Sequence, residues 1–132
     1  MPKLLLDSDV LVYFLNGNYK IAEHFNSYIL DDLATSRINY TELIFGAYNS
    51  NRIEKNLNKL LPFLEKLEIL EFDEASAIIF AKEKARLKKA GMPISDMDLM
   101  IASIAISNNL LLVTNNLRHF ERLKNIRLER WI

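Results

Sequence analysis

The segment LLLDSDVLVYFL, Leu4–Leu15, joins two patterns that decide the fold. A short apolar run, Lys3–Asp7, ends in a charge, which is typical of a strand buried on both faces of a parallel sheet. The residues Ser8–Leu15 then read as a helix, and the turn signal Asn16-Gly17-Asn18 closes it. A strand followed directly by a helix is the repeating unit of an α/β protein.

The same alternation continues along the whole chain. Further strands are expected at 34–38, 68–72, 110–113 and 126–131, and further helices at 19–30, 39–49, 52–67, 73–90, 95–108 and within 116–123. Pro62 is expected to kink or break its helix, and the helix 95–108 is apolar nearly all round and should be buried. These elements predict a three-layer α/β/α sandwich with a mostly parallel central sheet, and a ligand site beyond the carboxyl ends of its strands.

Length and composition limit the class of protein. A chain of 132 residues, half of them hydrophobic, is expected to form a single globular domain over residues 1–132. The absence of cysteine excludes disulfides and thiolate metal sites and fits a cytoplasmic protein. No apolar run is long enough to span a membrane, and MPKLLLDSDV does not resemble a signal peptide. Lys+Arg and Asp+Glu balance at 17 each, so the net charge gives no hint of a nucleic-acid-binding face.

Acidic residues recur where the predicted strands end and the predicted helices begin. Asp7 ends the first strand, and Glu42 and Asp98 each fall three residues after a polar residue, which is the spacing of a capping box. Capping explains each acid singly. It explains Asp96 and Asp98 together poorly, because the apolar helix that they open should draw its N-terminus into the protein.

Gathered carboxylates would repel one another. At about 5 Å and an effective dielectric constant near 20, each like-charged pair costs about 3 kcal/mol, and several pairs would rival the stability of a small domain. A divalent cation would remove that cost. Oxygen ligands without histidine or cysteine favour Mg²⁺ or Mn²⁺ over zinc.

Other catalytic patterns have less support. Asp7-Ser8-Asp9 after an apolar strand resembles the opening of haloacid-dehalogenase-type phosphatases, but no acid follows the strand at 110–113, where Thr114-Asn115-Asn116 stands. The two histidines, His24 and His119, form no metal-binding motif, although His119 follows the segment near the expected site.

Four segments in order resemble one family. LLLDSDVLVYFL, INYTELIFGA, PISDMDLMIASIA and LLLVTNNLRHFERL are similar to the ordered signatures of PIN domains, and more closely to the VapC toxins of toxin–antitoxin modules. The resemblance covers nearly the whole chain. It implies a PIN-like fold and a cytoplasmic, metal-dependent endoribonuclease that cuts structured RNA, such as tRNA or rRNA loops, and so inhibits translation.

The resemblance also implies roles for individual residues. The ligands of Mg²⁺ or Mn²⁺ would be Asp7, Glu42 and Asp98, with Asp96 as a catalytic helper. Asp9 stands where family members often have Asn, and Asn116 stands where many carry a further acid. The pocket would be completed by these two residues and by Ser8, Thr114 and Asn115, and Arg118 is expected to contact RNA.

The implied partners are a small VapB-like antitoxin, RNA and a second copy of the chain in a homodimer, with larger toxin–antitoxin assemblies built from these. The apolar-rich helix segment 57–67 could face the antitoxin, although core packing explains it equally well. An alternative function is a PIN-like module that binds RNA or a partner without cutting.

Overall fold

Strands and helices alternate along the chain in the computed structural model, which describes residues 1–132. The strands are β1 (Leu4–Leu6), β2 (Leu33–Ser36), β3 (Glu68–Leu70), β4 (Leu111–Val113) and β5 (Arg127–Glu129). The helices are α1 (Ser8–Leu15), α2 (Tyr19–Asn26), α3 (Arg37–Tyr48), α4 (Ile53–Glu65), α5 (Glu74–Lys89), α6 (Asp96–Ser107) and α7 (Leu117–Phe120), with one 3₁₀ turn, η1 (Leu30–Asp32).

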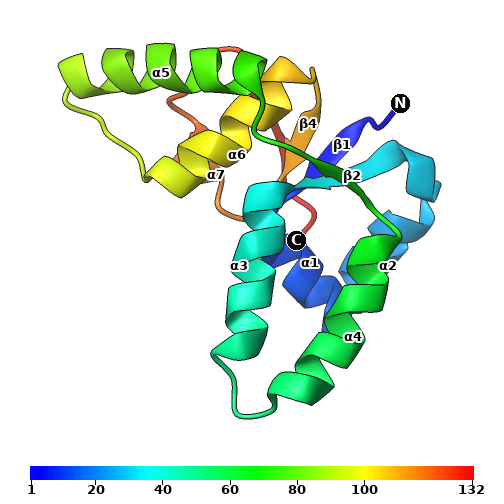
Figure 1. Cartoon of the computed structure of the whole chain (residues 1–132). Coiled ribbons are helices and arrows are strands. Elements are labelled where there is room, and N and C mark those ends of the chain that lie inside the picture. The colour runs from blue at the N-terminus through cyan, green and yellow to red at the C-terminus, as the bar shows by residue number, and fades with distance from the viewer.

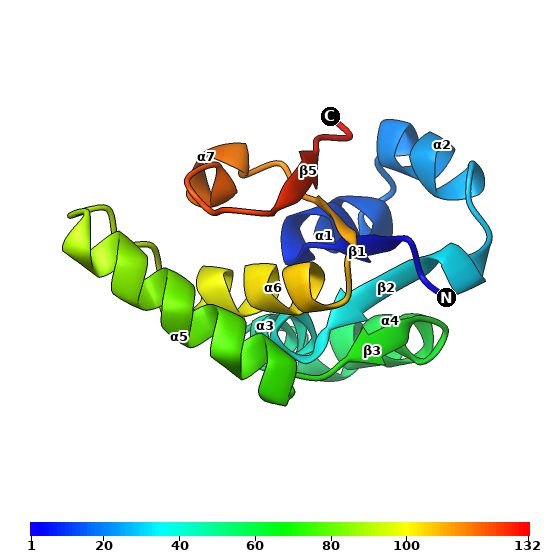
Figure 2. The same ribbon diagram turned by 90° about the horizontal axis from the view of Figure 1, so that it is seen from above.

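The five strands form one sheet in the order β3-β2-β1-β4-β5, and every neighbouring pair is parallel. β1 is therefore the central strand, with Leu4 beside Leu33 of β2 and Leu5 beside Leu112 of β4. Figure 1 shows α5, α6 and α7 gathered on one side of the strands and α1 to α4 on the other, and Figure 2 shows the same arrangement from above. The predicted α/β sandwich with a parallel central sheet is confirmed.

Alternation along β1 divides the core between the two faces of the sheet. Leu4 and Leu6 belong to the cluster formed with α1 to α4, whereas Leu5 belongs to the cluster formed with α5, α6 and α7. Successive strand residues point to opposite faces, so a strand with helices on both sides is apolar throughout. The helix α6 has six buried residues, as its sequence predicted.

Several boundaries differ from the predictions. The strand expected over 34–38 spans Leu33–Ser36, so α3 begins at Arg37 and not at 39. The strands expected over 68–72 and 126–131 are shorter, at Glu68–Leu70 and Arg127–Glu129. The helix expected over 19–30 ends at Asn26, and η1 follows it. The break expected at Pro62 is wrong, because α4 continues through this residue to Glu65. Pro62 has no N–H to donate to the carbonyl of residue 58, so α4 forgoes one main-chain hydrogen bond but does not end there.

No helix of the structure is both long and apolar enough to cross a membrane.

Candidate active site

Asp7 lies at the carboxyl end of the central strand and is the only buried ionisable side chain, with 6% of its surface exposed. Its Oδ1 accepts hydrogen bonds from the Ser8 N–H (2.8 Å) and from Asn39 Nδ2 (2.9 Å), and its Oδ2 accepts one from Thr114 Oγ1 (2.8 Å). The three donors follow β1, β2 and β4, which are adjacent in the sheet. The topology itself therefore assembles the surroundings of Asp7 at the carboxyl edge, where parallel sheets place their sites.

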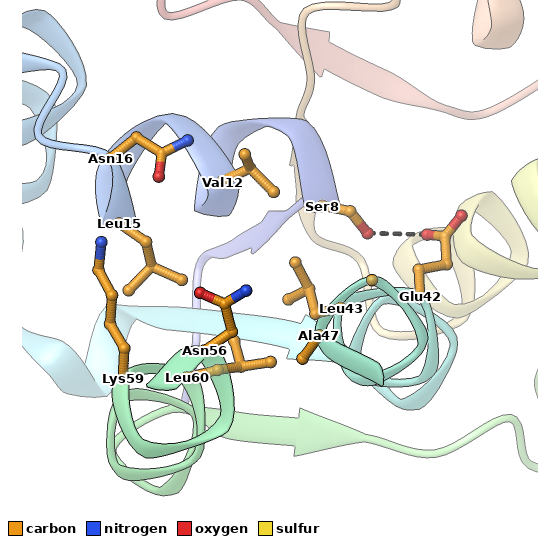
Figure 3. Close-up of a pocket in the computed structure, with 11 residues that line it drawn as sticks. Ser8, Val12, Leu15, Asn16, Glu42, Leu43, Ala47, Asn56, Lys59 and Leu60 are labelled. Carbon is orange, nitrogen blue, oxygen red and sulfur yellow. Dashed lines mark hydrogen bonds between the residues drawn. The ribbon is translucent and has the colours of Figure 1, made fainter. Parts of the chain in front are cut away.

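Asp9 and Glu42 lie beside Asp7. Asp9 Oδ2 accepts a hydrogen bond from the Asn115 N–H (2.9 Å), which ties the first turn of α1 to the loop after β4. Glu42 Oε1 accepts one from Ser8 Oγ (2.7 Å), as Figure 3 shows. Glu42 is on the second turn of α3, so its carboxylate reaches the site across the junction of two helices.

Asp98 brings α6 to the same place. The Ser95 side chain caps this helix by accepting a hydrogen bond from the Asp98 N–H (3.2 Å). The Asp98 carboxylate does not complete a capping box but lies 3.1 Å from Nδ1 of His119, measured from Oδ2. Its side chain is 24% exposed, so it forms the open side of the cluster.

The pKa values show that these carboxylates act on one another. Burial, then the charge of Asp9, and to a smaller extent that of Glu42, raises the pKa of Asp7 from 3.8 to about 6, against the hydrogen bonds from Thr114 and Ser8. Burial also raises the pKa of Asp9 and of Glu42, and the charge of Asp98 adds to both. Asp7, Asp9, Glu42 and Asp98, hereafter the carboxylate cluster, thus concentrate negative charge that the protein itself leaves largely uncompensated.

The structure does not bring Asp96 into the carboxylate cluster. Its Oδ1 lies 2.9 Å from Nζ of Lys84 on α5, in an ion pair whose acidic side chain is 62% exposed. Residues two apart on a helix point in nearly opposite directions, so the helix that turns Asp98 inward turns Asp96 outward. Its expected role as a catalytic helper has no support in its position.

The start of α3 also corrects a prediction and reveals a residue that the sequence reasoning missed. Glu42 does not form a capping box with Asn39. The box consists of Ser36 and Asn39, whose side chains each accept a hydrogen bond from the other's main chain. Asn39 is fully buried and also donates to Asp7 and to Ser8 Oγ. The spacing Ser36-x-x-Asn39 is the sequence signal for this residue, but the strand expected over 34–38 includes Ser36 and conceals its role as a cap.

The loop after β4 supplies the remaining predicted pocket residues. Thr114 and the Asn115 main chain contact Asp7 and Asp9, and the Asn116 N–H donates to Thr114 Oγ1 (3.0 Å). The Asn116 and Arg118 side chains make no hydrogen bond or ion pair with the protein and line a neighbouring hollow instead.

The atoms of the carboxylate cluster that could bind a metal ion are all oxygens and carry surplus negative charge. This chemistry suits a hard divalent cation. The side chains do not form a ready-made group of three metal ligands. Ser8 contacts only Oε1 of Glu42, and His119 contacts only Oδ2 of Asp98, so each of these carboxylates keeps a second oxygen that could turn toward a cation.

Comparisons with known proteins agree with this geometry. The PIN domain family model matches residues 4–126. A curated relative from Salmonella typhimurium, named tRNA(fMet)-specific endonuclease VapC, is 39% identical over 132 residues, covering 99% of each chain. Ribonuclease VapC2 from Haemophilus influenzae is 36% identical and covers both chains completely. The crystal structure of DNA-bound VapBC from Salmonella typhimurium contains a chain that superposes with a TM-score of 0.94 at 38% identity, covering 100% of each chain.

Full-length similarity at this level, an ordered set of four motifs and a carboxylate cluster at the edge of a parallel sheet all lead to one assignment. The chain belongs to the PIN domain family and, within it, to the VapC ribonucleases.

Proposed function

We propose that the protein is a divalent-metal-dependent endoribonuclease that cleaves tRNA and serves as the toxin of a toxin–antitoxin pair. The observation that carries this proposal is the carboxylate cluster, in which burial and neighbouring charge raise the pKa of Asp7 to about 6. The relatives named as tRNA(fMet)-specific endonucleases from Salmonella typhimurium and Shigella flexneri support tRNA as the substrate.

The residues of the carboxylate cluster and their neighbours have different roles in the proposed reaction. Asp7, Glu42 and Asp98 would hold Mg²⁺ or Mn²⁺, and Asp9 adds negative charge beside them. When bound, the cation supplies a Lewis acid for the phosphate and lowers the pKa of a water molecule that attacks it. Thr114 and Asn39 fix the Asp7 carboxylate by hydrogen bonds to both of its oxygens, so that it is oriented before substrate arrives.

A groove of about 370 Å³ next to the cluster supports an antitoxin partner. Figure 3 shows apolar side chains of α1, α3 and α4, among them Val12, Leu43 and Leu60, along its walls, with Glu42 at one end. An extended or helical segment with apolar side chains would fill the groove, and a basic side chain at its end would pair with the cluster. The neighbours described as VapBC complexes support such a partner.

The segment 57–67 has a divided role in this arrangement. Leu60 and Leu64 are buried in the core, so core packing explains most of its apolar character. Leu60 also reaches the groove, together with Asn56 and Lys59 of the same helix. The partner would therefore contact one edge of α4.

We further propose that residues 1–132 fold as one unit, since a single sheet extends from β1 to β5 with helices on both faces. The absence of cysteine supports the cytoplasm as its compartment. The homodimer implied by the family resemblance stays a prediction, which light scattering on the purified chain would measure.

The test uses a matched pair of acids on one helix. Purified protein is incubated with labelled initiator tRNA and Mg²⁺, with and without excess chelator. We expect the unsubstituted chain to cleave the tRNA and the chelator to abolish cleavage. Asp98→Asn should lower the cleavage rate at least a hundredfold, whereas Asp96→Asn should keep it within threefold of the unsubstituted chain. Uncut tRNA in Mg²⁺ and in Mn²⁺, with RNA binding unchanged by Asp98→Asn, would instead identify a non-catalytic binding module.

A further inference from the structure

A polar hollow of about 420 Å³ lies beside the carboxylate cluster and is not part of it. Its polar lining consists of Asn115, Asn116, Arg118, His119, Glu121 and Arg130. Two of these residues join it to the cluster. The Asn115 N–H donates to Asp9 Oδ2 (2.9 Å), and His119 Nδ1 lies 3.1 Å from Asp98 Oδ2. A chain bound across the cluster would pass directly into this hollow.

The hollow has cationic groups that the protein does not neutralise. Arg118 makes no hydrogen bond or ion pair with the protein, and the single bond from Arg130 goes to the Asn115 carbonyl (3.0 Å), not to a carboxylate. The segment 115–132, which supplies the whole lining of the hollow, is basic as well, since it contains five Lys and Arg but two Asp and Glu. Unpaired guanidinium groups at a concave surface are suited to binding a phosphate.

The Asn115 side chain adds a group that can read a base. Neither its Oδ1 nor its Nδ2 has a hydrogen-bond partner in the protein, although both atoms are shielded from solvent. Buried polar groups without partners are rare and destabilising, so folding does not explain this amide. One donor and one acceptor on a single planar group match the hydrogen-bonding edge of an unstacked base, which the amide would reach by turning from its shielded position into the hollow that Asn115 lines.

We propose that the hollow is a nucleotide subsite, in which Arg118 and Arg130 bind the phosphate next to the scissile bond and Asn115 reads the adjoining base. This inference rests on the proposed ribonuclease function and adds to it a determinant of sequence preference. None of the three side chains belongs to the carboxylate cluster. The proposal therefore assigns them to the binding of RNA and not to the cleavage step.

Cleavage of an RNA hairpin pool with a randomised loop, followed by sequencing of the cut ends, tests the role of Asn115. The unsubstituted chain should prefer particular bases at one position beside the cut, and Asn115→Ala should lose that preference while kcat stays within threefold. The variant should melt at the same temperature or higher, because the side chain makes no internal hydrogen bond.

The two arginines are tested on one labelled hairpin. Arg118→Ala and Arg130→Ala should each raise KM about tenfold, with kcat within threefold, for all loop sequences alike. Each should also lower the slope of log affinity against log salt by about 0.7–0.9, as expected for one lost phosphate contact. Lys89→Ala, which removes an exposed charge on α5 outside the hollow, is the control and should change neither quantity appreciably.

Fluorescence anisotropy of the same hairpin in chelator separates this proposal from the proposed function. If the unsubstituted chain never cuts but binds the hairpin, and both arginine variants bind at least fivefold more weakly, the ribonuclease assignment fails and the subsite stands. If the variants bind as tightly as the unsubstituted chain, or if Asn115→Ala keeps the full base preference, the subsite is refuted even though cleavage persists.

Discussion

Replacing Asp7 by asparagine should stabilise the protein while abolishing its activity. Asn is nearly isosteric with Asp and carries no charge. In the native state the buried carboxylate has a pKa of about 6 instead of 3.8, and this difference corresponds to about 3 kcal/mol of destabilisation when the group is ionised. The substitution removes this destabilisation and therefore raises the free energy of unfolding. It also removes the carboxylate on which cleavage depends.

The expected net gain is smaller than the full electrostatic value. The Asn side chain can still accept from the Ser8 N–H and Asn39, but Thr114 must accept a hydrogen bond where it now donates one. Allowing about 1 kcal/mol for this less favourable geometry leaves a gain of about 2 kcal/mol at pH 8. For a chain of 132 residues this corresponds to an increase of about 7 °C in the melting temperature.

The sign of the pH dependence is fixed by the direction of the pKa shift. Between about pH 4 and pH 6 the folded chain keeps a proton on Asp7 that the unfolded chain has already lost, so rising pH destabilises the folded state across this window. Asp7→Asn lacks this group. The stability difference between the two proteins should therefore be smallest near pH 4, grow through pH 6 and level off above it.

Thermal and urea denaturation at pH 4, 6 and 8 measure the difference, with Asp96→Asn as the control. Asp96 is in an exposed ion pair, so its substitution should change stability by less than about 0.5 kcal/mol. Addition of Mg²⁺ should raise the melting temperature of the unsubstituted chain more than that of Asp7→Asn. The reasoning is refuted if Asp7→Asn melts below the unsubstituted chain at pH 8, or if the difference is the same at all three pH values.

Three further predictions concern the start of α3, the conformations of two glycines and the affinity for Mg²⁺. Asn39→Ala should lower the unfolding free energy by about 2–4 kcal/mol in urea titrations, because it removes the capping box and the hydrogen bonds to Asp7 and Ser8. Thr41→Ala, at an exposed position, is the control and should have little effect, and equal losses for the two variants would contradict this prediction. Gly46→Ala, in the last turn of α3 with nothing within 4 Å of the new Cβ, should raise the unfolding free energy by about 0.5–1 kcal/mol. Gly91→Ala, at φ +70°, should lower it by about 1 kcal/mol, and a change of the same sign for both would be inconsistent with the backbone described. The affinity for Mg²⁺ should weaken as the pH falls through about 6, because protons then compete with the cation for Asp7. Calorimetric titrations that show a constant affinity from pH 5 to pH 8 would exclude Asp7 as a ligand.

The fold could be predicted largely from local patterns. The helix expected over Ser8–Leu15 has those bounds, because a strand, an N-cap acid and a turn signal delimit it on both sides. The helix expected over 19–30 was too long because Tyr28 and Ile29 continue an apolar spacing. Tyr28 in fact stacks on Trp131 from the other end of the chain, a contact that no local pattern reveals.

The site could be predicted in part. The family resemblance implies Asp7, Glu42 and Asp98 as one group, whereas the sequence alone explains Glu42 equally well as a helix cap; in the structure the charge of Glu42 acts on Asp7 and that of Asp98 acts on Glu42. The spacing of Asp96 and Asp98 already excluded their facing the same way along a regular helix, a geometric constraint that the charge-based reasoning overlooked. The pairing of His119 with Asp98 depends on how α7 packs near α6, which the sequence alone does not specify.

The connections around Asp7 have a consequence for the newly made chain. Thr114 donates a hydrogen bond to Asp7, 107 positions earlier in the sequence, and the Asn115 N–H donates one to Asp9, 106 positions earlier. Neither bond can form until β4 and the loop after it have been synthesised. A ribosome-bound fragment that ends before this loop contains all four acids of the carboxylate cluster and the helices α1 to α6, yet lacks the Thr114 donor to Asp7 and the Asn115 donor to Asp9. Truncated products of this chain are therefore expected to be harmless to the cell that makes them, and the segment 114–132 decides when the protein becomes active.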